Sequence, residues 1–321
     1  MDIRIVFLDT LTVADLPDEL ARFGKLGSFT AYEATAPGRV VERARHAQVV
    51  ITNKVVLGAD ELSRLPELRL VCIAATGMNN VDLAAAAARG IPVRNVAGYS
   101  TESVAQLTLA LFFNLSMDLP HLNRAVYDGT YTGHGAFGYW RRPFRELNAL
   151  RWGIVGMGAI GRRTAALVSA FGAEVVHYAT SGRPAGDDDA YPRVSFAELL
   201  AGCDVISVHC PLTPQTRGLF DYAALRRLRP TAYLINVARG GVVHEEDLVR
   251  ALDEGRLAGA ASDVYTTEPL PADHPYLSVA EPHRLLLTPH MGWASVGART
   301  ALLAGVRQNI VDWAARAEDP A

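Results

Sequence analysis

The chain has 321 residues, which is more than one small domain needs, so two domains are expected. Half of the residues are hydrophobic, a fifth are charged and the formal net charge is −3; this is an ordinary globular composition that implies no polyanion-binding surface. Apolar runs fall short of the roughly 20 residues of a membrane span. We therefore expect no membrane partner and no nucleic-acid partner.

The first nine residues predict a strand rather than a signal peptide, because they lack a basic region and a small-residue cleavage site. Cys72, Cys203 and Cys210 form no motif, and three thiols in a chain of this length suit a reducing cytoplasm. His209 precedes Cys210, but two neighbouring donors do not supply the three or four ligands of a metal centre. A cytoplasmic protein without a bound metal is therefore predicted.

Short apolar runs alternate with helix-like segments over the first hundred residues. This repetition predicts a parallel sheet with helices on both faces. The expected strands are Ile3–Leu8, Phe29–Tyr32, Val49–Thr52, Leu70–Ala75 and Val93–Val96, and the expected helices include Val40–Arg45 and Leu83–Arg89.

The pattern changes after Gly98. Glu102–Leu115 holds neither glycine nor proline and is largely apolar, which predicts a long buried helix. Val126–Phe144 mixes aromatic residues with glycines and predicts an irregular segment. It either covers the chain's own core or forms a dimer arm, since aromatic residues are enriched at interfaces. Both alternatives stay open at this point.

A second alternating unit begins at Arg151. Its clearest expected helices are Ala159–Phe171 and Glu245–Glu254, and a final helix, Ser295–Ala315, follows its last strand. Its expected strands are Gly153–Val155, Glu174–Tyr178, Val205–Val208, Tyr233–Asn236, Ala258–Asp263 and Leu285–Thr288.

A dinucleotide-binding fingerprint, G-x-G-x-x-G, follows the first strand of this unit. Gly156 permits a tight turn, Gly158 lets the backbone approach a pyrophosphate, and Gly161 lets helix and strand pack closely. Ala159 and Ile160 open the helix, whose free N–H groups suit the negative phosphates. The strand before and the helix after make the motif specific, so we predict a nicotinamide dinucleotide cofactor.

The next strand ends where an acid would bind the adenosine ribose of NAD. Here it ends at Tyr178, and Ala179 follows in place of an acid. Thr180, Ser181 and Arg183 could bind a 2′-phosphate instead. The alternative is that Arg183 is a solvated loop residue. NADP(H) is favoured, with NAD(H) or use of both as the alternatives.

Three later strands end in polar residues that can take part in chemistry. Arg239, Glu268 and His290 each follow one of these strands, and ligands of open α/β sheets bind beyond the carboxyl ends of strands. An arginine, an acid and a histidine at three such ends can converge on one site.

These motifs make the chain resemble the D-isomer-specific 2-hydroxyacid dehydrogenase family over essentially its whole length. The matching pieces, in order, are GMGAIGR, HCPLTPQTRGL, INVARGGVVHEEDL, ASDVYTTEPLP and LTPHMGWAS. Within the family, ITNKV, AATGMNNVDLAAAAARGIPVRNV and FGYWRRPFRELNALRWGIVG are most similar to the glycerate dehydrogenase/hydroxypyruvate reductase group.

The resemblance implies three catalytic roles that fit the residue chemistry. Arg239 would hold the substrate carboxylate with its planar fork of donors and polarise the ketone. His290 would supply the proton that the developing alkoxide needs. Glu268 would bind the other imidazole nitrogen and favour the protonated ring.

The resemblance also implies binding roles. Asp263 would bind the nicotinamide carboxamide, and substrate would meet the loop of Thr76, Gly77 and Met78, with Asn53 and Lys54 at the mouth of the cleft. The remaining cofactor contacts implied for this chain are His209, Pro211, Thr216, Val237, Ala238, Arg239 and His290.

The predicted fold is two doubly wound α/β domains, one Rossmann-like and one flavodoxin-like, with the active-site cleft between them. Residues 1–98 and 292–321 would form a discontinuous catalytic domain, and residues 99–291 the cofactor domain. The predicted reaction is reversible reduction of a small 2-keto acid such as hydroxypyruvate or glyoxylate, by a homodimer. Alternatives are a family member acting on phosphite or phosphonopyruvate, and a non-enzymatic NAD(H)-binding protein like the corepressors of this fold.

Overall fold

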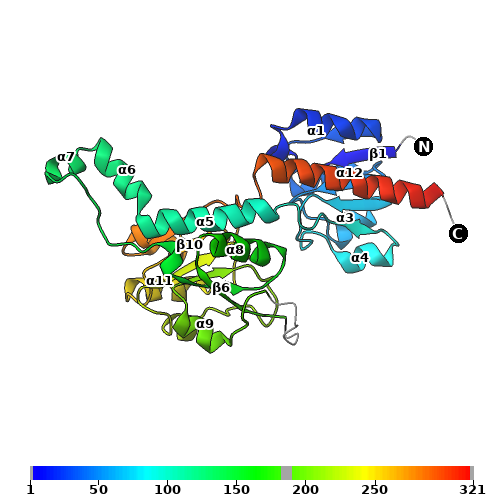
Figure 1. Ribbon diagram of the computed structural model, residues 1–321. Helices are drawn as coiled ribbons and strands as arrows, with labels where there is room; N and C mark the ends of the chain where they lie inside the picture. The colour runs from blue at the N-terminus through cyan, green and yellow to red at the C-terminus, as the bar shows by residue number, and fades with distance from the viewer. Residues whose placement is uncertain (1–2, 182–189, 319–321) are drawn as a thin grey trace. The chain divides into compact units, whose positions relative to one another are not determined.

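The computed structural model, drawn in Figure 1, describes residues 3–181 and 190–318. The chain divides into two compact units, Met1–Ser100 with Ala294–Ala321, and Thr101–Trp293. Each unit is built on one sheet in which every strand pairing is parallel. Among the described residues, no helix has both the length and the apolar character needed to cross a membrane.

The sheet of the first unit has the strand order β2-β1-β3-β4-β5. Its central strands β3 and β4 are fully buried, as their Val- and Ile-rich sequences predict for a parallel sheet covered on both faces. Its strands are β1 (Ile3–Phe7), β2 (Gly27–Ala31), β3 (Val49–Thr52), β4 (Leu70–Ile73) and β5 (Val93–Arg94). Its helices are α1 (Pro17–Ala21), α2 (Val40–Ala44), α3 (Ala59–Ser63), α4 (Leu83–Ala88) and α12 (Val296–Glu318), with 3₁₀ turns at Leu11–Val13, Arg22–Lys25 and Pro37–Arg39.

The sheet of the second unit has the order β11-β10-β9-β8-β6-β7. A parallel bridge between His177 and Arg193 continues it beyond β7. Its strands are β6 (Arg151–Val155), β7 (Glu174–Tyr178), β8 (Val205–Val208), β9 (Tyr233–Asn236), β10 (Gly259–Ser262) and β11 (Leu285–Leu287). Its helices are α5 (Thr101–Met117), α6 (Leu119–Tyr127), α7 (Thr130–His134), α8 (Ala159–Ala170), α9 (Phe196–Gly202), α10 (Tyr222–Leu225) and α11 (Glu245–Asp253), with 3₁₀ turns at Leu147–Ala149, Pro275–Ser278 and Pro282–Arg284.

Side chains that alternate along β6 enter two hydrophobic cores of the second unit. Trp152 and Ile154 belong to one core, and Val155 belongs to the other. Helix α5 contacts α8, β9 and β10, as expected for the long apolar helix predicted there. Burial of apolar residues in both cores is the main force that holds the strand ends at their positions.

The aromatic segment is more helical than predicted. The prediction of an irregular Val126–Phe144 was wrong for Val126 and Tyr127, which end α6, and for Thr130–His134, which forms α7. Gly129 and Gly135 flank this helix with φ of 83° and 75°, in the left-handed region that glycine adopts at little cost. The helix therefore begins directly after Gly129 and stops before Gly135. Figure 1 shows α6 and α7 extending away from the sheet of their unit.

Candidate active site

The glycine turn after β6 has the geometry of a dinucleotide-binding turn. Gly156 has φ of 93°, and a Cβ there would lie 2.7 Å from the backbone nitrogen of Cys210. A Cβ on Gly161 would lie 2.2 Å from the carbonyl oxygen of Gly156, so helix α8 can sit this close to the turn only without a side chain. Both positions therefore require glycine.

Gly158 differs from these two, because a Cβ placed on it would meet nothing within 4 Å. It is the N-cap of α8 and makes no side-chain cap hydrogen bond, so open space adjoins the start of the helix. The first N–H groups of a helix have no partners within the helix and attract anions. The residues at this turn thus fit the pyrophosphate of a nicotinamide dinucleotide.

The end of β7 supplies no acid, since Ala179, Thr180 and Ser181 follow Tyr178. The Thr180 side chain makes a hydrogen bond with the Cys210 thiol, whose pKa is raised by burial to about 11. Arg183, the predicted partner of a 2′-phosphate, lies outside the described residues.

His209 stands at the end of β8 in a buried polar chain. The Trp152 indole N–H donates to Ser207 Oγ over 2.9 Å, and Ser207 Oγ lies 2.9 Å from His209 Nε2. Burial lowers the pKa of His209 to about 3, so the ring is neutral at physiological pH. Its Nδ1 is buried and has no hydrogen-bond partner among the described residues, and a contact with the cofactor remains a prediction. Sequence reasoning did not find the Ser207 and Trp152 contacts.

The other predicted cofactor residues at β8 and β9 lie in turns beyond the strands. Thr216 is buried, and its hydroxyl donates to the Pro211 carbonyl oxygen over 2.7 Å. Val237 and Ala238 follow the last residue of β9, and the Ala238 N–H donates to Asn236 Oδ1. Thr216 therefore shapes the turn, and direct cofactor contacts of these residues remain predictions.

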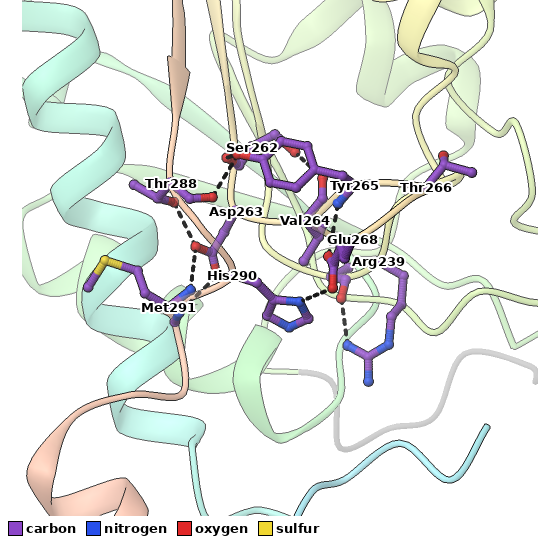
Figure 2. A network of polar contacts seen from close by, with 12 residues as sticks. Arg239, Ser262, Asp263, Val264, Tyr265, Thr266, Glu268, Thr288, His290 and Met291 are labelled. Carbon is purple, nitrogen blue, oxygen red and sulfur yellow. Dashed lines mark hydrogen bonds and ion pairs between the residues drawn. The ribbon is translucent and has the colours of Figure 1, made fainter. Parts of the chain in front are cut away.

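Arg239, Glu268 and His290 come from loops after β9, β10 and β11, which are neighbours in the sheet. The carboxyl ends of parallel strands lie at one edge, and Figure 2 shows the three side chains gathered there. Gly240 makes this arrangement possible, because a Cβ on it would lie 2.0 Å from the backbone carbon of Tyr265. The β9 and β10 loops consequently touch through their backbones.

His290 and Glu268 form a direct pair. Nδ1 of His290 lies 2.7 Å from Glu268 Oε2, and both side chains are partly exposed. The carboxylate accepts the Nδ1 proton, so Nε2 is the nitrogen left to exchange a proton with a ligand. In Figure 2 it points away from Glu268. This geometry matches a general acid/base with an orienting acid.

His290 has φ of 51°, which is uncommon for a residue other than glycine. The buried Asp263 carboxylate holds the residues around it, because it accepts hydrogen bonds from Thr288 Oγ1 at 2.7 Å and from the Met291 and Gly292 N–H groups at 2.8 Å each. Asp263 therefore anchors the loop of His290, and its predicted contact with the nicotinamide remains a prediction.

Arg239 is half-buried, and its Nη1 donates to the Ala238 carbonyl over 2.7 Å. The Arg239 carbonyl accepts from Asn236 Nδ2 over 3.0 Å. These bonds fix the loop and one nitrogen of the guanidinium group. No carboxylate of the described residues forms an ion pair with Arg239 within 4.0 Å, so its remaining donors can take a substrate anion.

The predicted substrate residues lie in the first unit, after β3 and β4. Asn53 is buried and donates through Nδ2 to the Ala74 carbonyl, and Thr76 Oγ1 donates to the Val96 carbonyl over 3.2 Å. Gly77 and Met78 continue the turn after Thr76. Their contact with substrate, and the predicted cleft between the domains, remain predictions.

Asp9 was missed by sequence reasoning, although it follows a strand end like the other site residues. Its carboxylate accepts hydrogen bonds from the successive N–H groups of Asn53, Lys54 and Val55 at 2.8, 2.6 and 2.9 Å. Burial raises the pKa of this carboxyl, and the three backbone bonds oppose that shift. Asp9 thus holds the loop that carries Asn53.

The described residues contain no group of three or more metal-binding side chains.

Known proteins match both the sequence and the fold. The family described as "D-isomer specific 2-hydroxyacid dehydrogenase, NAD binding domain" matches residues 109–292. A glycerate dehydrogenase from Methylorubrum extorquens is 34% identical over 324 residues, covering 96% of this chain and 99% of the relative. A hydroxypyruvate reductase from Blautia hydrogenotrophica is 34% identical over 281 residues, covering 87% of this chain and 86% of the relative.

A solved structure extends the match to three dimensions. An NADPH-dependent glyoxylate/hydroxypyruvate reductase from Sinorhizobium meliloti, in complex with NADP and malonate, aligns with a TM-score of 0.82 and 28% identity, over 98% of this chain and 94% of that chain. The chain belongs to the D-isomer-specific 2-hydroxyacid dehydrogenase family, a class of nicotinamide-dependent oxidoreductases. The predicted family, fold class and enzyme class are confirmed.

Proposed function

We propose that the protein reduces a small 2-keto acid, of the hydroxypyruvate or glyoxylate type, reversibly to the D-2-hydroxy acid. The observation that supports this most directly is the His290–Glu268 pair beside Arg239 at neighbouring strand ends. The names of the relatives from Methylorubrum, Blautia and Sinorhizobium agree with this substrate class.

Each residue has a separate task in this reaction. Arg239 binds the carboxylate of the keto acid and polarises its ketone through charge-assisted hydrogen bonds. His290 donates a proton from Nε2 to the oxygen that becomes the hydroxyl, and takes it back in the reverse direction. Glu268 holds the Nδ1 proton and stabilises the imidazolium. The nicotinamide of the cofactor supplies the hydride that adds to the carbonyl carbon.

An initial-rate screen tests this substrate class. Purified protein is assayed with NADH and NADPH against hydroxypyruvate, glyoxylate, pyruvate, phenylpyruvate and phosphonopyruvate, and with NAD and NADP against phosphite. Hydroxypyruvate or glyoxylate should have the highest kcat/KM. Preferred oxidation of phosphite or reduction of phosphonopyruvate would replace the proposed substrate, and cofactor binding without any turnover would favour a corepressor-like role.

Glu268→Gln should leave activity at low pH and shift the upper limb of the kcat profile to lower pH. The neutral amide removes the charge that stabilises the imidazolium, so the ring loses its proton at lower pH. A matched control is Glu67→Gln, because Glu67 pairs with the exposed His46 across 2.9 Å. Profiles of parent and Glu268→Gln that superpose would remove Glu268 from the mechanism.

We further propose that NADPH is used at least as well as NADH. The end of β7 offers no acid to repel a 2′-phosphate, and the Sinorhizobium relative is named NADPH-dependent. A charge-assisted bond from Arg183 would contribute about tenfold to a hundredfold in preference.

Arg183→Ala should therefore raise the KM for NADPH and leave the KM for NADH nearly unchanged, which makes NADH the internal control. Steady-state constants with both cofactors decide this. A tenfold or greater preference of the parent for NADH would contradict the proposal and show that a missing acid alone does not create a preference for NADPH.

We propose that the protein is a homodimer and that α6, α7 and the segment after them form the contact. Tyr127 is 85%, Phe137 100% and Trp140 64% exposed, which is unusual for large apolar side chains on a monomer. Trp140→Arg should yield monomers by light scattering at micromolar concentration, whereas Val311→Arg on α12 should not. A monomeric parent protein would exclude the dimer.

A reducing, cytoplasmic location is also proposed. Cys72, Cys203 and Cys210 are all buried and unpaired. Free thiols of this kind persist where glutathione keeps them reduced.

A further inference from the structure

We infer that Tyr265, to which no role in the reaction has been assigned above, is a positioning residue that holds Glu268 and His290 in their relative positions. This inference rests on the proposed function, because it concerns the acid/base pair of that reaction. Tyr265 lies three residues after β10, is 8% exposed and contacts the loops of both members of the pair. In the view of Figure 2, Tyr265 lies above the pair.

The hydrogen bonds of Tyr265 connect it to Glu268 and to the backbone of His290, and with the Glu268–His290 bond they form a closed ring of contacts. Its backbone N–H donates a hydrogen bond to Glu268 Oε1 over 3.1 Å, and Glu268 Oε2 accepts a hydrogen bond from His290 Nδ1. Its hydroxyl donates to the Thr288 carbonyl over 2.7 Å. The same carbonyl accepts the backbone N–H of His290 over 3.0 Å. One residue thereby sets the distance between the carboxylate and the backbone that bears the imidazole.

The hydroxyl acts as a donor throughout the pH range of an enzyme assay. Burial raises the pKa of Tyr265 to about 12, with smaller contributions from the acids Asp263, Glu268 and Glu245. The Thr288 carbonyl has two lone pairs, and these two donors use both. Loss of the hydroxyl leaves the carbonyl its bond to His290, so no buried group becomes unsatisfied and the fold should tolerate Tyr265→Phe.

Further contacts, separate from those to Glu268 and Thr288, hold the ring and backbone of Tyr265. The ring packs edge-on against His274 and Tyr276, at centroid distances of 5.9 and 6.2 Å. The next backbone N–H, that of Thr266, donates to Glu245 Oε1 over 2.8 Å, and Glu245 Oε2 lies 3.1 Å from His274 Nε2. Because this frame is rigid, the hydroxyl can fix the position of Thr288 rather than follow it.

Two loops of the second unit bring charged groups near His290: the loop after β10 carries Glu268 and Asp263, and the loop after β9 carries Arg239. The segment from Thr288 to Gly292 carries no charged side chain besides His290 itself. Tyr265→Phe changes none of these charges. Any change in the protonation of His290 in this variant therefore reports a change in the geometry of the Glu268–His290 pair.

The test compares Tyr265→Phe with Tyr276→Phe, which removes a neighbouring buried hydroxyl of the same aromatic cluster. Loss of one neutral hydrogen bond in a positioning role should lower kcat about threefold to tenfold in Tyr265→Phe, while the dissociation constant of the cofactor stays within about twofold. The upper limb of the kcat profile should move to lower pH, because His290 holds its proton less firmly when Glu268 is misplaced. Tyr276→Phe should stay within about twofold of the parent in kcat and keep its pH profile.

Titration of the His290 ring by NMR supplies a second readout that requires no turnover. His290→Ala identifies the signal, and the midpoint should fall in Tyr265→Phe and not in Tyr276→Phe. If the parent reduces no keto acid, the proposed function fails while this titration still decides the positioning role. The inference would be overturned if Tyr265→Phe and Tyr276→Phe had the same kcat and the same His290 titration midpoint. It would also be overturned if Tyr265→Phe lowered kcat while the His290 midpoint stayed at the parent value.

Discussion

His290→Ala should lower kcat for keto-acid reduction by about 10²–10⁴, the usual contribution of a positioned general acid. The proton that the substrate oxygen needs comes from Nε2, because Nδ1 is paired with Glu268 across 2.7 Å. Alanine supplies no proton, and water would have to enter the site in its place. Cofactor binding should change little, since the pyrophosphate turn at Gly156 and Gly158 lies in another loop.

The control for this experiment is His46→Ala. His46 also pairs through Nδ1 with a carboxylate, Glu67, at 2.9 Å, but its side chain is 74% exposed and lies in the other unit. It should keep the activity of the parent. Stopped-flow measurement of a single turnover, with cofactor bound in advance, separates the chemical step from binding. A His290→Ala enzyme as fast as the parent in that measurement would exclude His290 as the proton donor.

Arg239→Lys should lower kcat/KM for the keto acid by about tenfold to a hundredfold despite the retained charge. Lysine offers a compact ammonium in place of a planar fork, so a two-point contact with a carboxylate is lost, and a charge-assisted hydrogen bond is worth this much. The Nη1 bond to the Ala238 carbonyl is also lost, which frees the side chain to move. Both effects weaken the hold on the substrate in the transition state.

Arg64→Lys is the matched control, because Arg64 forms an exposed ion pair with Asp60 and has no part in the proposed reaction. Its kcat/KM should equal that of the parent, since exposed ion pairs contribute little. Oxamate and malonate, which carry the carboxylate without being reduced, should inhibit the parent more strongly than Arg239→Lys. An unchanged specificity constant and unchanged inhibition would place the carboxylate anchor on another residue.

The local sequence already determined most of the framework. Strands such as Val49–Thr52, Glu174–Tyr178, Val205–Val208 and Tyr233–Asn236 have the bounds that their apolar runs predicted. Runs of this kind are recognisable because strands of a parallel sheet are buried on both faces. The glycines of the pyrophosphate turn were also recognisable, since positive φ and close backbone contact exclude any other residue. Helices α6 and α7 were missed, because they are short and are bounded by Asp118 and by glycines in left-handed conformations.

The candidate catalytic residues could be named from the sequence for a topological reason. Residues that follow parallel strands share one edge of the sheet, so Arg239, Glu268 and His290 were expected together before any distance was known. The family motifs strengthened this expectation. The sequence alone therefore determined the fold class and the cofactor class, and it named the candidate catalytic set, whose roles stay predictions.

Only the tertiary structure decided how these residues are held. Tyr265 and Thr288 are 23 residues apart, and nothing in either segment indicates that the Tyr265 hydroxyl donates a hydrogen bond to the Thr288 carbonyl. The same is true of Asp263 with the loop of His290, and of Asp9 with the loop of Asn53. Such contacts depend on rotamers and loop angles set by packing of distant segments, and these leave no periodic pattern in the sequence. The pattern of residues specifies which strand ends share one edge of the sheet, whereas the packed loops specify which groups bond there and at what angle and distance.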